Sequence, residues 1–292
     1  MRGRGTSPDG RAPLCCRMAH PGLAFGGIVP DVFSHIDPLY VISGILVGGL
    51  VGFTGVGGGS LMTPILILLF RIHPSTAVGT DLLYAAATKT AGTAVHGWNK
   101  TIDWKVVGWL ALGSVPMTVL TVLAIYYLGV DSKIVQGTIT KTLGVALLLT
   151  AFSLFLRKPL MRWYDKNVGE PDSRHVARLT VLTGAILGVL VTLSSVGAGA
   201  IGVTALVMIY PKMPAQRIVG SDIAHAVPLT LLAGLGHSIL GTINWHILVS
   251  LLCGSLPAIV VASIASARTS DTVVRVALGI VLLMVVIRFW FL

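Results

Sequence analysis

The sequence predicts an all-α polytopic membrane protein, and three observations support this fold class. Hydrophobic residues make up 54% of the 292 residues, and the mean hydropathy is +0.87. Charged residues make up only 11%, whereas a soluble domain carries roughly 25%. Several apolar segments reach the length of about 20 residues that a helix needs to cross a bilayer. This composition excludes a soluble enzyme, a nucleic-acid-binding protein and a disordered chain, and we expect a multi-pass protein of the inner (plasma) membrane.

The chain divides into a tail, two repeats and a loop between them. Residues 1–37 are rich in Gly, Pro and Arg without periodicity, and we expect a disordered N-terminal tail. Residues 38–156 form the first predicted transmembrane repeat, residues 157–178 a polar cytoplasmic loop, and residues 179–292 the second repeat. About eight to ten helical segments are expected, with apolar segments at 38–54, 61–70, 75–97, 104–128 and 134–156, and again at 179–195, 201–210, 215–240, 245–266 and 271–291.

Two of these segments are too short to cross a bilayer. Residues 61–70 and 201–210 would reach only about 15 Å as helices. Each follows a glycine cluster, at 55–60 and at 196–200. Glycine runs break helices and let the chain turn. Each repeat is therefore predicted to begin with a helix, a glycine break and a half-length or re-entrant helix.

The second half of the chain matches the first in register. At an offset of 140, Gly57 and Gly59 meet Gly197 and Gly199. One inserted residue moves the offset to 141, at which polar residues match as well. A shared register of Asp, His, Trp and Pro is typical of an internal duplication. The matched pairs at offset 141 are Asp81 with Asp222, His96 with His237, Asp103 with Asn244, Trp104 with Trp245 and Pro116 with Pro257.

The distribution of Lys and Arg favours inverted repeats. If each broken segment folds back or crosses twice, twelve Lys and Arg residues of the connecting segments face one side and three face the other. If each broken segment crosses once, the division is nine to six. The excess of positive charge in cytoplasmic loops therefore favours the first arrangement, which gives each repeat an odd number of crossings.

The paired glycine breaks are the predicted substrate-binding site. The half-helix after each break begins with free backbone N–H groups and the positive end of the helix dipole, which favour an anion. Corresponding interrupted helices in two halves indicate a site near the bilayer midplane. The alternative is that the glycines only permit close helix packing. The predicted binding residues at the breaks are Thr54, Gly57, Gly58, Gly59, Ser60, Ser195, Gly197, Ala198 and Gly199.

Lys89 is added to this site because it lies in the middle of an apolar segment. A charge there costs on the order of 2.5–3.5 kcal/mol and is functional by default. We expect it to attract the anion or to gate the site. The alternative is a structural pair with Asp81, but eight residues separate the two. They would lie about 80° apart around the helix with a rise of about 12 Å.

Two acids and three histidines are candidates for proton coupling or gating. Asp81 and Asp222 lie near the start of the third segment of each half, where the helix dipole also favours an acid. His96 and His237 lie near the end of the same segments, where a histidine also serves as a dipole partner or an interface residue. His225 follows Asp222 at an i,i+3 spacing on one helix face. This pair is the stronger relay candidate.

No motif for catalysis, metal or cofactor binding is present. The glycine cluster at 55–60 lacks the GK[ST] ending of a phosphate-binding loop. The three cysteines, Cys15, Cys16 and Cys253, show no CxxC or Cys/His metal spacing. We therefore expect no enzyme activity, no cofactor and no metal.

The chain resembles the TauE/SafE family of sulfite exporters and sulfonate permeases. The resemblance rests on Gly48-Gly49-Leu50-Val51-Gly52-Phe53-Thr54-Gly55-Val56-Gly57-Gly58-Gly59, on Pro64 and on Ala77-Val78-Gly79-Thr80-Asp81, and it covers residues 38–292. In the second half it extends through Gly197-Ala198-Gly199, Gly220-Ser221-Asp222 and the Gly-Ser-x-Pro at Gly254–Pro257. The second break departs from the first, since Ser194 and Ser195 replace glycine and Ala200 stands where Ser60 does.

The resemblance implies secondary transport of a small sulfur-containing anion, such as sulfite or an organosulfonate, by an internally duplicated helical fold in the lipid bilayer. The family contains exporters, importers and members of unknown substrate, so the substrate does not follow from it. An anion channel is the first alternative, and a membrane-embedded sulfur-metabolism enzyme is a weaker one because Cys253 is the single cysteine in the apolar segments. Assembly into a homo-oligomer is left open.

Overall fold

All the regular secondary structure in the described part of the chain is helical, with no strand there, which confirms the predicted all-α class. The computed structural model describes residues 36–54, 59–98, 100–167 and 173–266, together with 279–280, 283–285 and 287. Residues 1–35 of the predicted tail and most of the predicted segment 271–291 therefore lie outside the described residues. The helices are α2 (Pro38–Thr54), α3 (Gly59–Leu68), α4 (Pro74–Trp98), α5 (Trp104–Leu128), α6 (Lys133–Asn167), α7 (Ser173–Ser194), α8 (Ala200–Ile209), α9 (Ala215–Ile239) and α10 (Trp245–Ser266).

Helix boundaries agree with the sequence except around the predicted loop 157–178. There, α6 continues to Asn167 and α7 already begins at Ser173. The predicted loop is therefore wrong as secondary structure over most of its length. Leu, Met, Arg and Lys between Arg157 and Asn167 all have high helix propensity. The charged residues end the apolar pattern without ending the helix.

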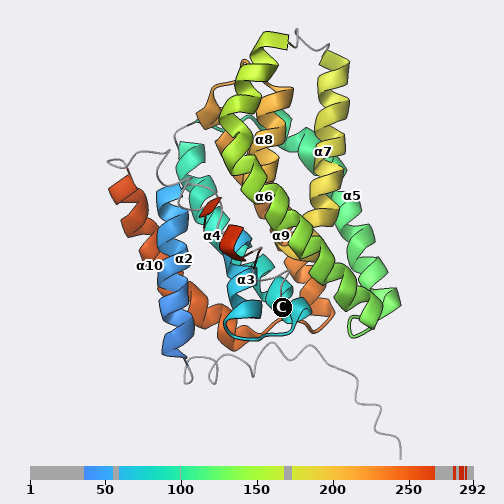
Figure 1. The fold of residues 1–292 in the computed structure, drawn as a ribbon, viewed down its shortest axis with the longest axis vertical. Helices are drawn as coiled ribbons and strands as arrows, with labels where there is room; N and C mark the ends of the chain where they lie inside the picture. The colour runs from blue at the N-terminus through green and yellow to red at the C-terminus, as the bar shows by residue number, and fades with distance from the viewer. Residues whose placement is uncertain are drawn as a thin grey trace, which may run out of the picture.

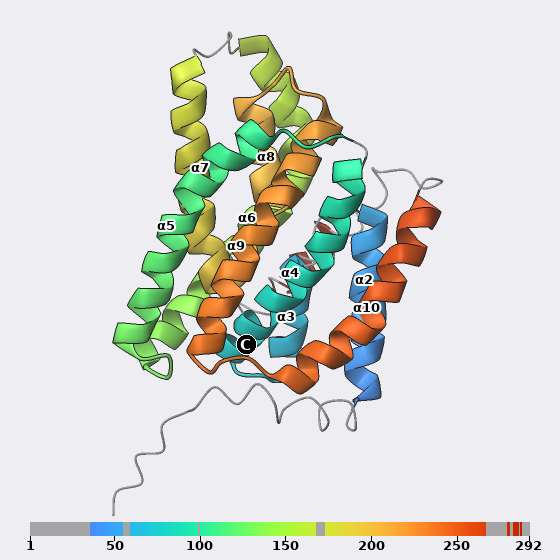
Figure 2. The ribbon, with the colours of Figure 1, turned by 180° about the vertical axis from the view of Figure 1, so that it is seen from behind.

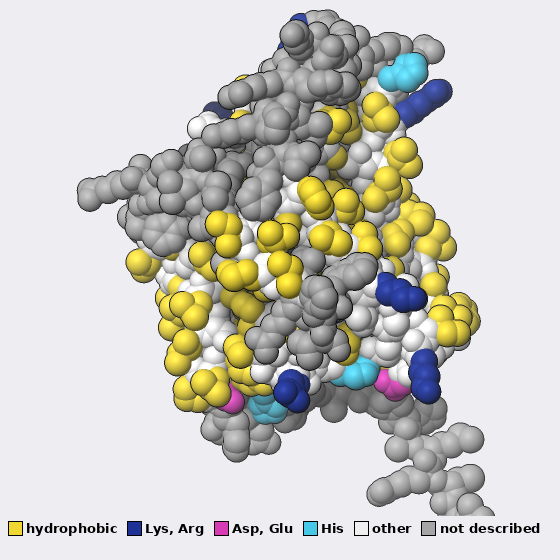
Figure 3. All heavy atoms as spheres, in the orientation of Figure 1, with side chains coloured by type: hydrophobic (Ala, Val, Ile, Leu, Met, Phe, Trp, Pro, Cys, Tyr) yellow, Lys and Arg dark blue, Asp and Glu magenta, His cyan; other side chains and the backbone are white. Residues whose placement is uncertain are grey.

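The outer surface of the bundle is apolar, as expected for a protein in lipid. Five of the described helices have an apolar stretch long enough to cross a bilayer, in α5, α6, α7, α9 and α10. Large hydrophobic side chains are exposed along them, such as Leu112 at 60% and Val261 at 68%. In Figure 3 hydrophobic side chains cover much of the coloured part of the face, while acidic side chains lie near its lower end and histidine side chains near its lower and upper ends.

Helices of one half of the chain pack mainly against helices of the other half. The two third segments, α4 and α9, pack against each other at its centre. The first helix of one half pairs with the fourth of the other, so that α2 packs along α10 and α7 packs along α5. Figures 1 and 2 show these pairs on opposite sides of the α4–α9 pair. The α2–α10 and α7–α5 pairs therefore correspond to each other in the internal match, and α4 and α9 are themselves matched segments.

Matched glycines make matched helix contacts. A Cβ added at Gly48 would lie 2.7 Å from the backbone of Ser255, and one added at Gly188 would lie 2.6 Å from the carbonyl oxygen of Ser114. These residues correspond at offsets of 140 and 141. Such glycines therefore allow the close approach of two helix backbones.

Both half-length helices turn back toward the end of the bundle from which they came. In Figures 1 and 2, α3 runs back to the end at which α2 begins, and α8 runs back to the end at which α7 begins. The α6–α7 end and the α9–α10 connection lie at opposite ends of the bundle. This course is the one that the inverted-repeat prediction requires of each glycine break.

Candidate functional site

Four ionisable side chains are buried where α4 and α9 pack together. Asp81, Asp222 and His225 are fully buried, and Lys89 is 5% exposed. Burial of a charge without compensation is costly, so buried charges are paired, neutralised or functional. The central helix pair therefore carries a polar site inside an apolar bundle.

Lys89 contacts the glycine break of the other half. Its ammonium Nζ donates a hydrogen bond to the carbonyl oxygen of Ala198 at 2.8 Å. It also interacts electrostatically with Asp222 and with Asp81. The alternative of a structural pair between Lys89 and Asp81 is not the contact seen, since the hydrogen bond of the ammonium goes to the backbone of the break. Two predicted site residues from different halves, Lys89 and Ala198, are in direct contact.

The second break has a backbone that needs glycine. Gly197 and Gly199 have φ angles of 120° and 132°, and Ser195 has a φ of 57°. A Cβ at Gly197 would lie 2.9 Å from Leu190. The backbone N–H of Gly202 donates to the carbonyl oxygen of Gly197 at 3.2 Å as the new helix starts. Gly199 is the N-cap of α8 and supplies no side-chain cap, so the sequence leaves the first turn of α8 uncapped by its own residue.

Asp81 lies at the start of the first half-helix. Its Oδ2 accepts hydrogen bonds from the backbone N–H of Thr63, at 3.2 Å, and from the Thr63 hydroxyl. The Ser195 hydroxyl approaches the same carboxylate, but Ser195 Oγ and Asp81 Oδ1 have no partner in hydrogen-bond geometry. A carboxylate near the positive end of α3 is favourably placed. Asp81 therefore lies between the first turn of α3 and Ser195 at the second break.

Asp222 lies against the start of the second half-helix. A Cβ at Gly202, in the first turn of α8, would collide with Asp222 Oδ1. Neither carboxylate oxygen of Asp222 has a hydrogen-bond partner. His225 instead bonds through Nε2 to the Ser114 hydroxyl at 2.8 Å, and its Nδ1 is unpartnered. The predicted Asp222–His225 relay is therefore not hydrogen-bonded, because the histidine ring reaches toward α5.

The two remaining histidines close turns at helix ends. His96 Nδ1 lies 2.9 Å from Thr101 Oγ1, and His237 Nδ1 lies 3.0 Å from Thr242 Oγ1. His237 Nε2 also lies 3.1 Å from the carbonyl oxygen of Thr192, to which it can donate. Both sit in the last turn of their helices. Their contacts match the interface alternative, and the structure does not bring them into the Asp81–Lys89 centre.

Several predicted binding residues fall outside what the structure describes. Gly57 and Gly58 are among them, and Thr54, Gly59 and Ser60 are described only as the end of α2 and the start of α3. Thr63, which the sequence offers as a hydroxyl donor beside the first break, does lie at the site. Ser114 is a site residue to which the sequence pattern assigned no role, because only the packing of α5 against α9 brings it to His225.

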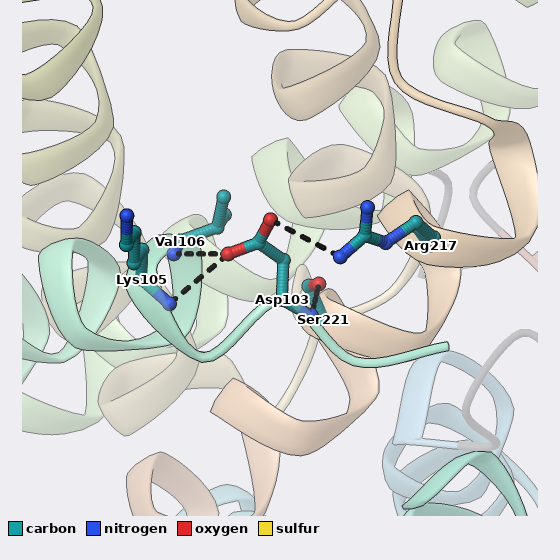
Figure 4. Close-up of polar contacts among 5 residues, drawn as sticks. All are labelled: Asp103, Lys105, Val106, Arg217 and Ser221. Atoms are coloured by element: carbon teal, nitrogen blue, oxygen red, sulfur yellow. Dashed lines mark hydrogen bonds and ion pairs between the residues drawn. The ribbon is translucent and has the colours of Figure 1, made fainter. Parts of the chain in front are cut away.

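A residue of the first half, Asp103, holds the helical turn of α9 that precedes Asp222. Figure 4 shows Asp103, the N-cap of α5, accepting from the backbone N–H groups of Lys105 and Val106 at 3.1 and 3.4 Å. The Asp103 carboxylate also pairs with Arg217 at 3.6 Å, and the Asp103 N–H donates to Ser221 Oγ at 2.8 Å. Ser221 precedes Asp222, so this contact holds the start of the central helix.

A cavity lies next to the helical turn of α4 that contains Thr80, which corresponds to Ser221 in α9. It has a volume of about 330 Å³ and lies where α2 and α10 begin. The N–H of Asn244, one of its lining residues, donates to Thr80 Oγ1 at 3.0 Å. Thr80 precedes Asp81. The lining residues are Asp37, Tyr40, Asn244, His246, Ile247 and Ser250.

Fold and site together define a polytopic membrane protein with paired helix breaks around a buried charged centre. The chain belongs to the sulfite exporter TauE/SafE family, whose model matches residues 40–289. This match confirms the family resemblance. No solved structure gives a significant match to the chain.

Similar proteins are described as membrane transporters. The probable membrane transporter protein YjnA of Bacillus subtilis is 38% identical over 231 residues, which cover 79% of this chain and 90% of the relative. The probable membrane transporter protein MJ0441 of Methanocaldococcus jannaschii is 28% identical over 70% of this chain and 72% of its own length. YunE of Bacillus subtilis, also a probable membrane transporter protein, is 23% identical over 74% and 84%.

These comparisons confirm that the chain is a multi-pass membrane transporter and not an enzyme. The alternative of a membrane-embedded sulfur-metabolism enzyme is thereby left without support. The inner membrane is the usual placement of such a protein.

Proposed function

We propose that this chain is a secondary carrier of a small sulfur-containing anion, of the sulfite or organosulfonate class, across the inner membrane. The anion binds between the two halves near the bilayer midplane, and alternating access of two inverted repeats carries it across. The family description supports the sulfur chemistry, since the matching model is that of sulfite exporters.

One observation carries this proposal. The buried ammonium of Lys89 reaches from α4 to the carbonyl of Ala198 at 2.8 Å, in the break that precedes α8. A buried positive charge and the positive end of a half-helix then lie at one place, and both favour an anion. Gly197 and Gly199 have positive φ angles, which favour glycine, and neither carries a side chain. A small oxyanion can therefore approach this backbone closely.

Binding to the purified full-length protein tests the proposal. Thermal unfolding is measured with sulfite, thiosulfate, sulfoacetate, taurine or sulfate, because a ligand that binds the folded state raises the melting temperature by linkage. We expect at least one sulfur anion to raise it and chloride at equal ionic strength to leave it unchanged. No response to any of the five would contradict the proposal.

Flux in proteoliposomes separates a carrier from the channel alternative. A carrier saturates with substrate, and unlabelled anion inside the vesicle accelerates uptake of labelled anion. A channel with the same site shows neither effect. Counter-transport of the anion that stabilises the protein is therefore the expected result.

A further inference from the structure

Asp222 has a buried carboxyl group to which no group of the protein donates a hydrogen bond. The residue is fully buried, and neither of its oxygens has a partner. Its Oδ1 lies against the first turn of α8, where a Cβ built at Gly202 would collide with it. The backbone N–H of Gly202 donates instead to the carbonyl oxygen of Gly197 at 3.2 Å, and the N–H of Val203 donates to that of Gly199 at 2.9 Å. An ionised carboxylate here would lose its hydration without replacement, which is costly.

The matched acid of the first half has the donors that Asp222 lacks. Asp81 Oδ2 accepts hydrogen bonds from both the backbone N–H and the hydroxyl of Thr63. At the offset of 140 that relates the two glycine breaks, Thr63 corresponds to Val203. Valine has the branched shape of threonine without the hydroxyl, so the sequence itself removes the donor from the second half. The surroundings of Asp81 therefore suit a carboxylate, and those of Asp222 suit the neutral acid.

The charged groups near Asp222 do not replace the missing donors. Lys89, on α4, acts on Asp222 electrostatically, but its ammonium donates to the carbonyl oxygen of Ala198 and not to the carboxyl group. On α9 itself, His225 is bonded through Nε2 to Ser114 of α5. Helix α8 carries no titratable side chain. The other groups on the helices against α9 are at its start or exposed, and they are Asp103, which pairs with Arg217, and His175 and Arg178 on α7.

We propose that Asp222 is the proton-binding residue of the carrier and that one proton moves together with each anion. In the conformation described here, the carboxyl group holds its proton. When the site opens to water, the O–H bond breaks, the proton passes to water, and the electron pair stays on the carboxylate, which water then solvates. This inference deepens the proposed function, on which its statement about transport rests.

The charge of Lys89 explains why the proton and the anion travel together. Its ammonium lies at the second break, where the anion is proposed to bind. A neutral Asp222 leaves this positive charge to the anion, whereas an ionised Asp222 would compensate the charge and repel the anion. Binding of the anion and retention of the proton therefore favour each other by linkage. A rise in pH removes the proton and should weaken anion binding.

Infrared spectroscopy of the purified full-length protein tests the protonation without any transported anion. The C=O stretching band of a protonated carboxyl group is separate from the bands of carboxylates and amides. At neutral pH the wild-type protein should show such a band, Asp222→Asn should lack it, and Asp81→Asn should keep it. A wild-type protein without the band, or an Asp222→Asn protein that retains it, would overturn the inference. Where Asp222→Asn does not fold, loss of the band in Asp81→Asn has the same consequence.

Val203→Thr tests the physical cause that we assign to the protonation. This variant restores to the second half the hydroxyl that Thr63 provides in the first, with little change of side-chain shape. The ionised form of Asp222 then gains a donor, so the carboxyl band at neutral pH should weaken and the carboxylate bands should grow. An unchanged carboxyl band in the folded variant would contradict the argument from the missing donor.

Uptake into proteoliposomes tests the coupling, with labelled sulfoacetate as the probe because its charge is constant near neutral pH. With the membrane potential clamped, an inward proton gradient of one pH unit should raise sulfoacetate accumulation by up to about tenfold, since one proton supplies about 1.4 kcal/mol. Asp222→Asn should show the same uptake with and without the gradient. Wild-type uptake that ignores the gradient overturns the coupling. Absence of any uptake concerns the proposed function instead, and the infrared band still decides whether Asp222 holds a proton.

Discussion

The backbone N–H of Asp103 donates a hydrogen bond to Ser221 Oγ at 2.8 Å, and this contact ties the start of α5 to the central helix of the other half. The equivalent contact joins Asn244 to Thr80 at 3.0 Å. At the offset of 141, Asp103 corresponds to Asn244 and Thr80 corresponds to Ser221, so the two contacts are equivalent with the halves exchanged. Each cap residue thus fixes its own helix and the turn before an acid, Asp222 in one case and Asp81 in the other.

Asp103 provides the first prediction, because its cap and its ion pair can be separated. Asp103→Ala should lower the free energy of unfolding by about 1 kcal/mol, since the N–H groups of Lys105 and Val106 lose their acceptor. Asp103→Asn keeps an acceptor and deletes only the charge opposite Arg217. It should cost less than about 0.5 kcal/mol, because Arg217 is 48% exposed and such pairs contribute little.

Melting temperatures in detergent measure both variants. An equal loss in Asp103→Ala and Asp103→Asn would show that the ion pair, and not the cap, stabilises this connection. Salt provides an independent check, since the ion pair is screened at high ionic strength, whereas the hydrogen bonds of the cap persist.

A second prediction concerns the glycines between α2 and α10. Gly48→Ala should destabilise the protein by about 1–3 kcal/mol, because the new Cβ would lie 2.7 Å from the backbone of Ser255 and helices must separate. Gly49→Ala is the matched control. No atom lies within 4 Å of a Cβ at Gly49, and alanine is the better helix former by up to about 1 kcal/mol.

Adjacent positions on one helix should therefore respond with opposite signs. The ratio of folded to aggregated protein in size-exclusion chromatography, and the melting temperature, give the readout. Equal responses of Gly48→Ala and Gly49→Ala would mean that the α2–α10 contact is not close-packed.

The sequence is sufficient to predict elements that carry local signals. Both α5 and α10 begin where a cap residue precedes a Trp, at Asp103 and Asn244, and their bounds were predictable because the cap acts within one turn. The interruptions between α2 and α3 and between α7 and α8 were predictable because a glycine cluster also acts locally, by breaking the helix in which it occurs. The end of α6 was not, because Pro159 and the charged residues after Arg157 predict an end to the helix, whereas the helix continues to Asn167.

Contacts between the halves could not be predicted in this way. The i,i+3 spacing of Asp222 and His225 placed them on one helix face, but spacing says nothing about a neighbouring helix. The structure shows that Ser114 bonds the histidine. Likewise the midplane position of Lys89 followed from hydropathy, whereas its partner Ala198 lies 109 residues away. Packing of α4 against the second break decides that contact.

A third prediction addresses topology. The turn between α5 and α6 and the turn between α8 and α9 should lie on opposite sides of the membrane, as inverted repeats require. Asp131→Cys and Lys212→Cys each place a thiol at an exposed position of one turn. A membrane-impermeant maleimide should label Asp131→Cys in intact cells and Lys212→Cys only after the membrane is opened, because the positive charge favours the cytoplasmic side near Lys212.

The labelling needs a background without native thiols, in which Cys15, Cys16 and Cys253 are replaced by Ser. Cys253 is exposed on α10, so its removal should not disturb the core. Labelling of both positions from the same side would contradict the inverted arrangement, whichever side it is.

The last prediction concerns the charge at the substrate site. Lys89→Met keeps most of the apolar stem and deletes the ammonium that donates to Ala198. The sulfur anion that stabilises the wild-type protein should no longer raise the melting temperature, and flux should fall by at least tenfold, the equivalent of about 1.4 kcal/mol of lost attraction. Lys89→Arg keeps the charge but has a larger planar fork, and we expect only partial activity. Lys141→Met removes an exposed lysine of α6 and should transport normally. Because expression and monodispersity of all three variants are compared first, a folded Lys89→Met protein with normal flux would leave Lys89 with a structural role only.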